Sequence, residues 1–78
     1  MRKIILVTPL NNFQLLVKFD DGSQKKVDMN PYFETPVFSV LKTDEEAFKK
    51  VVNREYYIEW PALELDLSAD TLWHDGRA

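Results

Sequence analysis

The fold of this chain is decided by the stretch YYIEWPALELDLS, residues 56–68. Its first five residues alternate in a period of two, which predicts a β-strand over Tyr56 to Trp60. Pro61 has no N–H to donate, so we expect strand pairing to end there or to lie at a sheet edge. Ser68 is a typical N-cap residue, and it predicts the start of a last helix.

Strand parity gives this stretch two faces. Tyr56, Ile58 and Trp60 share one face, which we expect to pack into the core, while Tyr57 and Glu59 point the other way. Tyrosine is enriched at the centres of protein interfaces. The candidate interaction face therefore consists of the outward strand residues and the acidic residues of the following turn: Tyr57, Glu59, Glu64 and Asp66.

Upstream of this stretch, residues 3–29 are predicted to form a three-stranded antiparallel meander. The strands are expected over residues 3–8, 13–19 and 25–29, with a turn at 9–12. Asp21-Gly22 between two extended runs is a strong hairpin signal, because glycine accepts a positive φ. Ile4 to Val7 is apolar in both parities, so we expect the first strand to be covered on both faces.

The middle of the chain is predicted to be helical and short. Thr35-Pro36 indicates one helical turn over residues 36–41, although a short extended segment stays open. Thr43 and Glu46 have capping-box spacing, which predicts a helix over 44–50. After Ser68 we expect a C-terminal helix with Leu72 and Trp73 turned inward and a stop at Gly76.

Length and composition limit the class of protein. Seventy-eight residues predict a single domain spanning 1–78. The chain has no cysteine, and its apolar N-terminal run stops at Thr8-Pro9, too early for a signal peptide, so we expect a cytoplasmic protein. No stretch is long enough for a membrane span. The net charge of −3 argues against direct nucleic-acid binding.

Candidate catalytic groups are sparse. The single histidine, His74, lies in a polar tail and is expected to be a surface residue. Glu59, Glu64 and Asp66 could form an acid–base pair or a cation site, but too few ligands are present for Ca²⁺ and a solvated turn is favoured. We therefore predict no enzyme activity, no catalytic or metal-binding residue, no cofactor, and no identifiable small-molecule substrate.

The order of these features resembles the bacterial "domain of unknown function 2442" family over nearly the whole chain. The resemblance is carried by five segments, namely Phe19-Asp20-Asp21-Gly22 with Val27-Asp28, Phe38 to Leu41, Phe48-Lys49-Lys50-Val51, Ile58-Glu59-Trp60-Pro61, and Asp66-Leu67-Ser68 with Leu72. Many members carry a glycine after the Trp-Pro pair, where this chain has Ala62-Leu63-Glu64-Leu65. The family resemblance implies a small α+β domain without an established activity, often beside a second small protein in a toxin–antitoxin-like arrangement.

The sequence as a whole predicts an α+β domain, with a small antiparallel meander, a returning strand, one short central helix and a C-terminal helix. The expected function is a protein–protein interaction module, regulatory or antitoxin-like, that binds a protein partner or its own copy. Two alternatives stay open at this point. One is a nucleic-acid-associated regulator that acts through a partner, and the other is an uncharacterised enzyme.

Overall fold

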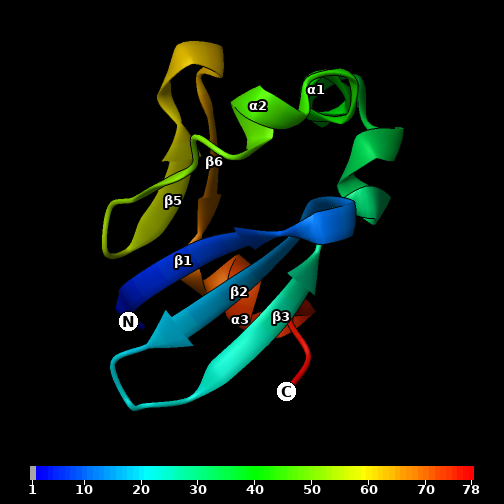
Figure 1. The fold of residues 1–78 in the computed structure, drawn as a ribbon. Helices are drawn as coiled ribbons and strands as arrows, with labels where there is room; N and C mark the ends of the chain where they lie inside the picture. Colours follow the sequence, from blue (N-terminus) through cyan, green and yellow to red (C-terminus); the bar gives the residue numbers. More distant parts are fainter. Residues whose placement is uncertain (1) are drawn as a thin grey trace.

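A computed structural model describes residues 2–78 of the chain, and its first sheet is the expected meander (Figure 1). Strands β1 (Ile4–Leu10), β2 (Gln14–Phe19) and β3 (Gln24–Asp28) pair antiparallel in that order. The alternation of β2 is reproduced in its burial, because Leu15, Val17 and Phe19 are fully buried. Gly22 has a φ of 89° in the loop between β2 and β3, as the Asp-Gly signal predicts.

Strand β1 is longer and less covered than the sequence suggests. It continues to Leu10 through Pro9, and only a short 3₁₀ helix, η1 (Asn11–Phe13), remains of the expected turn. Proline is tolerated because β1 is an end strand of its sheet. The expectation that both faces of β1 are covered is wrong: a bulge between Ile4 and Leu6 shifts the register and leaves Ile5 and Leu6 half exposed.

Four short helical segments connect the two sheets: η2 (Asn30–Glu34), α1 (Pro36–Ser39), η3 (Val40–Thr43) and α2 (Glu45–Phe48). The helical alternative for residues 36–41 is confirmed. The helix predicted over 44–50 is shorter, and its cap is a different residue. Asp44 caps α2 by accepting a hydrogen bond from Ala47 N (3.1 Å), whereas the Thr43 hydroxyl donates to Val40 O. The η3 helix runs through Thr43, so the extended cap position falls on Asp44.

The returning strand belongs to a second sheet. This sheet contains β4 (Val52–Asn53), β5 (Tyr57–Trp60) and β6 (Leu65–Ser68), paired antiparallel in that order. Strand β6 replaces the second half of the loop expected between Pro61 and Ser68. In the first half a 3₁₀ turn, η4 (Pro61–Leu63), reverses the chain. The short alternation Leu65, Asp66, Leu67 was the signal for β6, since both leucines are buried and the aspartate is exposed.

The last helix, α3 (Ala69–Asp75), is capped by Ser68 as predicted, with the serine hydroxyl accepting from Thr71 N. Leu72 is fully buried and Trp73 is half-buried beneath Arg2 and Lys25, whose cationic groups lie 3.5 and 3.9 Å from the indole centroid. Gly76 ends the helix with a φ of −75°, so a close approach to Lys25 and not a left-handed turn requires glycine there.

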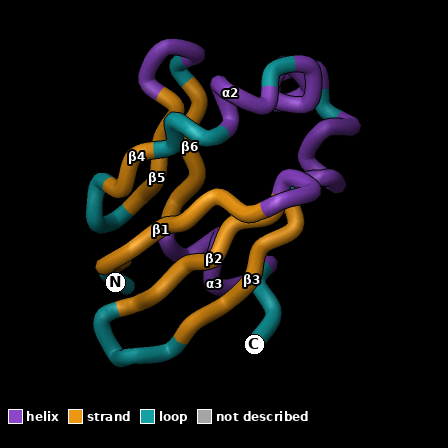
Figure 2. The backbone as a smooth tube through the Cα atoms, viewed as in Figure 1, coloured by secondary structure: helices purple, strands orange, loops and turns teal. Residues whose placement is uncertain are grey.

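The buried residues of both sheets meet in one hydrophobic cluster. Helix α3 lies against the back of the first sheet. Above that sheet, α2 lies beside the second sheet and α1 lies on the far side of α2 (Figures 1 and 2). Phe48 of α2 contacts both Phe13 and Trp60 with ring centroids 5.3 and 6.1 Å apart, and thereby links the two sheets. The fold class is α+β, as the sequence predicts. In the described residues, no helix is long and apolar enough to cross a membrane.

Candidate functional site

Three of the four predicted interaction residues share the outer face of the second sheet. In the register of β5 and β6, Glu59 lies opposite Asp66 and Tyr57 lies opposite Ser68. The inward residues Ile58 and Trp60 are buried, whereas 41% of the Tyr57 surface is exposed. The predicted outward direction of Tyr57 is therefore confirmed, and the buried neighbours hold its strand in a fixed position.

The fourth residue, Glu64, lies beside this face and not within the paired strands. It occupies the turn that joins η4 to β6, with φ 56° and ψ 39°. This is the left-handed region, which costs a residue with a side chain about 1–2 kcal/mol. Glycine accepts a backbone of this kind without the steric cost of a Cβ atom, so Glu64 keeps the turn at a cost in stability.

Facing carboxylates give this surface a negative charge that is only partly compensated. Glu59 and Asp66 stand directly opposite each other, an arrangement in which like charges repel. Arg54 lies next to them and donates from Nε to Glu59 Oε1 at 2.6 Å. Arg54 is not among the residues that the sequence predicts for this face. The missing signal is the tight β4–β5 hairpin, in which Arg54 N donates to Tyr57 O and thereby brings the arginine to the face.

Tyr56 is the sequence prediction that fails in this region. It was expected in the core with Ile58 and Trp60, but it precedes β5 in a bend and 45% of its surface is exposed. Its carbonyl oxygen accepts from Ala69 N, which ties the backbone to the start of α3. Tyr56 and Tyr57 are thus two adjacent, similarly exposed aromatic residues, and only Tyr57 belongs to the strand face.

His74 is on the surface, as expected, and takes part in a small polar network. The Tyr32 hydroxyl donates to Asp75, whose other carboxylate oxygen lies 3.0 Å from His74 Nδ1. The hydrogen bond from Tyr32, and then that with His74, holds the pKa of Asp75 below its usual range. Burial and the neighbouring carboxylate raise the pKa of Tyr32. Both shifts favour the hydrogen-bonded pair, which joins η2 to the end of α3.

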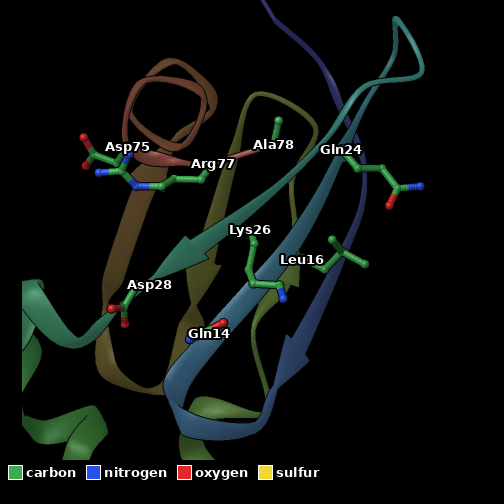
Figure 3. A pocket seen from close by; sticks show the side chains of 8 residues that line it. All are labelled: Gln14, Leu16, Gln24, Lys26, Asp28, Asp75, Arg77 and Ala78. Atoms are coloured by element: carbon green, nitrogen blue, oxygen red, sulfur yellow. The ribbon is translucent and has the colours of Figure 1, made fainter.

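A hollow of about 510 Å³ lies on the open face of the first sheet (Figure 3). The polar side chains that line it do not converge on one point. Arg77 points toward the side of Asp75, whereas Lys26 and Leu16 point away from it. Among residues 2–78, no group of three or more histidine, aspartate or glutamate side chains could hold a metal ion. Glu59 and Asp66 lie on the outer face of the second sheet, and Glu64 lies in the adjacent turn.

The fold and its exposed face define a small α+β domain in which β5, paired on both sides, presents one tyrosine among carboxylates. Residues 4–78 match the family described as "Protein of unknown function (DUF2442)", and the chain belongs to this family. The resemblance seen in the sequence is thereby confirmed. Comparison with curated proteins and with solved structures gave no match.

Proposed function

We propose that this chain is a protein-interaction domain whose contact surface is the outer face of β5 and β6. One observation carries the proposal: Tyr57 is 41% exposed on a strand whose inward neighbours are buried. A tyrosine held by a rigid strand loses little conformational freedom when it binds, which is why aromatic residues dominate interface energies. The carboxylates of Glu59 and Asp66 beside it favour a partner with a basic surface.

The proposed role is regulatory, as the antitoxin-like half of a pair of proteins in the cytoplasm. The absence of cysteine from the whole sequence supports the cytoplasmic setting. The proposal is one of binding and not of catalysis. It is supported by the position of His74, which is 89% exposed at the side chain and bonded to its neighbour Asp75.

Co-expression with the product of the adjacent gene tests this role. We expect the two proteins to co-purify and Tyr57→Ala to weaken the complex about tenfold or more, as hot-spot residues do. Tyr56→Ala is the matched control, because this tyrosine is equally exposed but lies off the strand face. Failure to co-purify, or loss of the complex only with Tyr56→Ala, would contradict the proposal.

Self-association is a second candidate, favoured by one further observation. Ile5 and Leu6 are adjacent on an end strand and are 49% and 52% exposed, which is unusual for large apolar side chains. Sedimentation across micromolar concentrations tests it, with the double variant Ile5→Thr, Leu6→Thr as the comparison. A monomer at every concentration would exclude self-association, and an unchanged dimer in the variant would place the contact elsewhere.

Nucleic-acid association through the partner is a further proposal of lower rank. The net charge of −3 disfavours direct binding to the phosphates of a nucleic acid. Filter binding at low salt should retain nucleic acid only when the partner is present. Retention of nucleic acid by the chain alone would contradict the proposal that binding requires the partner.

A further inference from the structure

Strand β6 is an end strand of the second sheet, and within residues 2–78 no other strand pairs with its outer edge. Ala69 N donates to Tyr56 O, and Arg54 N donates to Tyr57 O, so the carbonyl of Tyr57 is directed toward β4 and away from β6. Antiparallel pairs alternate between hydrogen-bonded and non-hydrogen-bonded, which makes Tyr57 and Ser68 a non-hydrogen-bonded pair. The same alternation applies to Glu59 and Asp66. The N–H and C=O groups of Asp66 and the N–H of Ser68 therefore point outward from the sheet edge, whereas the carbonyl of Ser68, the N-cap residue, belongs to the first turn of α3.

The side chains next to this edge are incompletely covered. Leu65 and Leu67 point inward from β6 and are 6% and 8% exposed, whereas every other member of the core is at most 1% exposed. The residual exposure lies on the end strand, where another strand would cover it. The inner side of the β6 edge is consequently apolar, and a small part of the Leu65 and Leu67 surface stays in contact with solvent.

The outer side of the same edge is acidic. Asp66 faces outward beside Glu59, and Glu64 precedes β6 in the turn. A second copy of this chain is a poor occupant of the edge, because pairing two β6 strands antiparallel about their centre would bring two Asp66 carboxylates close together. A segment with basic residues on its outer side would instead neutralise Asp66 and the part of the charge that Arg54 leaves on Glu59.

We propose that β6 accepts an extended partner segment in which apolar and basic residues alternate. The segment adds a fourth strand to the second sheet, its apolar side chains extend the core beside Leu65 and Leu67, and its basic side chains face Asp66 and Glu59. This inference rests on the proposed interaction role and specifies the chemistry of the partner.

Labelled peptides test the chemistry directly with the full chain. A Lys-Val alternating hexapeptide is compared with the same residues in block order and with a Glu-Val alternating hexapeptide, using fluorescence anisotropy. We expect the alternating basic peptide to bind at least about tenfold tighter than either control, because only it matches both sides of the edge. Equal binding of the two basic peptides would show charge attraction alone and would overturn the inference.

Ser68 allows a matched pair of variants. Its φ of −71° suits proline, so Ser68→Pro removes the outward N–H without forcing the backbone, but it also removes the cap hydroxyl that Thr71 N uses. Ser68→Ala removes the same hydroxyl and keeps the N–H. We expect Ser68→Pro to weaken peptide binding at least about fivefold relative to Ser68→Ala, as expected for a lost hydrogen bond. Circular dichroism should show the same fold in both variants.

The two proposals fail in different ways. If the co-expressed partner still binds the Ser68→Pro variant as it binds Ser68→Ala, the edge is not the site and this inference falls, while the interaction role stands. If the alternating peptide binds and Ser68→Pro abolishes it, yet no partner co-purifies, the edge chemistry stands and the pairing with the adjacent gene product falls. Asp66→Lys provides a third readout, because it should shift the preference from the basic to the acidic alternating peptide.

Discussion

The indole N–H of Trp60 donates a hydrogen bond to the backbone carbonyl of Phe48, 2.9 Å away and inside the core. Trp60 is on the second sheet, and Phe48 is the last residue of α2. The carbonyl belongs to the end of a helix, where the last four C=O groups have no partner within the helix. The indole thus satisfies a helix end and fixes α2 against β5.

Trp60→Phe should lower the free energy of unfolding by about 2–4 kcal/mol, because it leaves the Phe48 carbonyl unpaired and opens a small cavity. Urea denaturation followed by circular dichroism measures this change. Trp73→Phe is the control, since Trp73 is only half-buried and donates no such bond. A loss below about 1 kcal/mol for Trp60→Phe would mean that the hydrogen bond does not hold α2 in place.

Gly76→Ala should be destabilising for a steric reason. A Cβ atom at this position would lie 2.8 Å from both Leu72 O and Lys25 Cβ, although the backbone φ is ordinary. We expect a loss of about 1–3 kcal/mol, as for other overpacked positions. Gly22→Ala makes the comparison, because that site is open but has a φ of 89°, so its cost is about 1 kcal/mol of backbone strain. Thermal unfolding of both variants separates the two causes, and a larger loss at Gly22 would contradict the account.

Glu64→Gly should stabilise the protein by about 0.5–1 kcal/mol, since it relieves the left-handed backbone at φ 56°. Glu64→Ala removes the same carboxylate and keeps the strain, so it should give no such gain. Denaturant midpoints of the two variants provide the measurement. Equal stabilisation by both would assign the effect to charge and not to the backbone.

The cap of α2 allows the stability losses of two neighbouring variants to be compared. Asp44→Ala should cost about 1 kcal/mol of stability, because the Asp44 carboxylate accepts from Ala47 N. Thr43→Ala should cost less, as its hydroxyl only donates to Val40 O at the end of η3. If urea denaturation shows the larger loss for Thr43→Ala, the capping box expected from the sequence would be the better description.

Tyr32→Phe should reduce the pH dependence of stability. The pKa of Asp75 is lowered by the Tyr32 hydroxyl, so the unfolded chain takes up more protons as the pH falls. The stabilisation is present above the unfolded pKa of about 4, and it is lost on acidification through the lower pKa of the folded state. The raised pKa of Tyr32 has the opposite pH dependence. It stabilises the folded state below the unfolded pKa of about 10, and this stabilisation is lost as the pH rises above that value.

The Tyr32–Asp75 contact is partly solvent-exposed, so its contribution is about 1 kcal/mol or less. Unfolding free energies measured from pH 3 to pH 7 should therefore fall less steeply in Tyr32→Phe than in the unchanged protein. His74→Ala is the control, because His74 is the lesser cause of the Asp75 shift and should flatten the profile less. Parallel profiles for all three proteins would contradict the assignment.

Local patterns in the sequence were sufficient for the meander, the Asp21-Gly22 loop, the Ser68 cap and the outward direction of Tyr57. Each of these depends on neighbours a few residues apart: alternation along β2, a glycine with positive φ, a hydroxyl three residues before its donor, and strand parity. The family and the α+β class follow from the order of such signals.

The tertiary structure decided which strands share a sheet. Strand parity cannot show that β5 leaves the meander, because the choice depends on β4 and β6, each too short to be read with certainty from its own residues. Packing also decided that Tyr56 is exposed and that Asp44 is the cap in place of Thr43. The candidate face depended on both the sequence and the tertiary structure. The sequence placed Tyr57 and Glu59 outward, whereas the pairing of β5 with β6 brought Asp66 opposite Glu59 and left the edge of β6 open. Only the tertiary structure could decide this, because cross-strand neighbours are set by register and not by sequence distance.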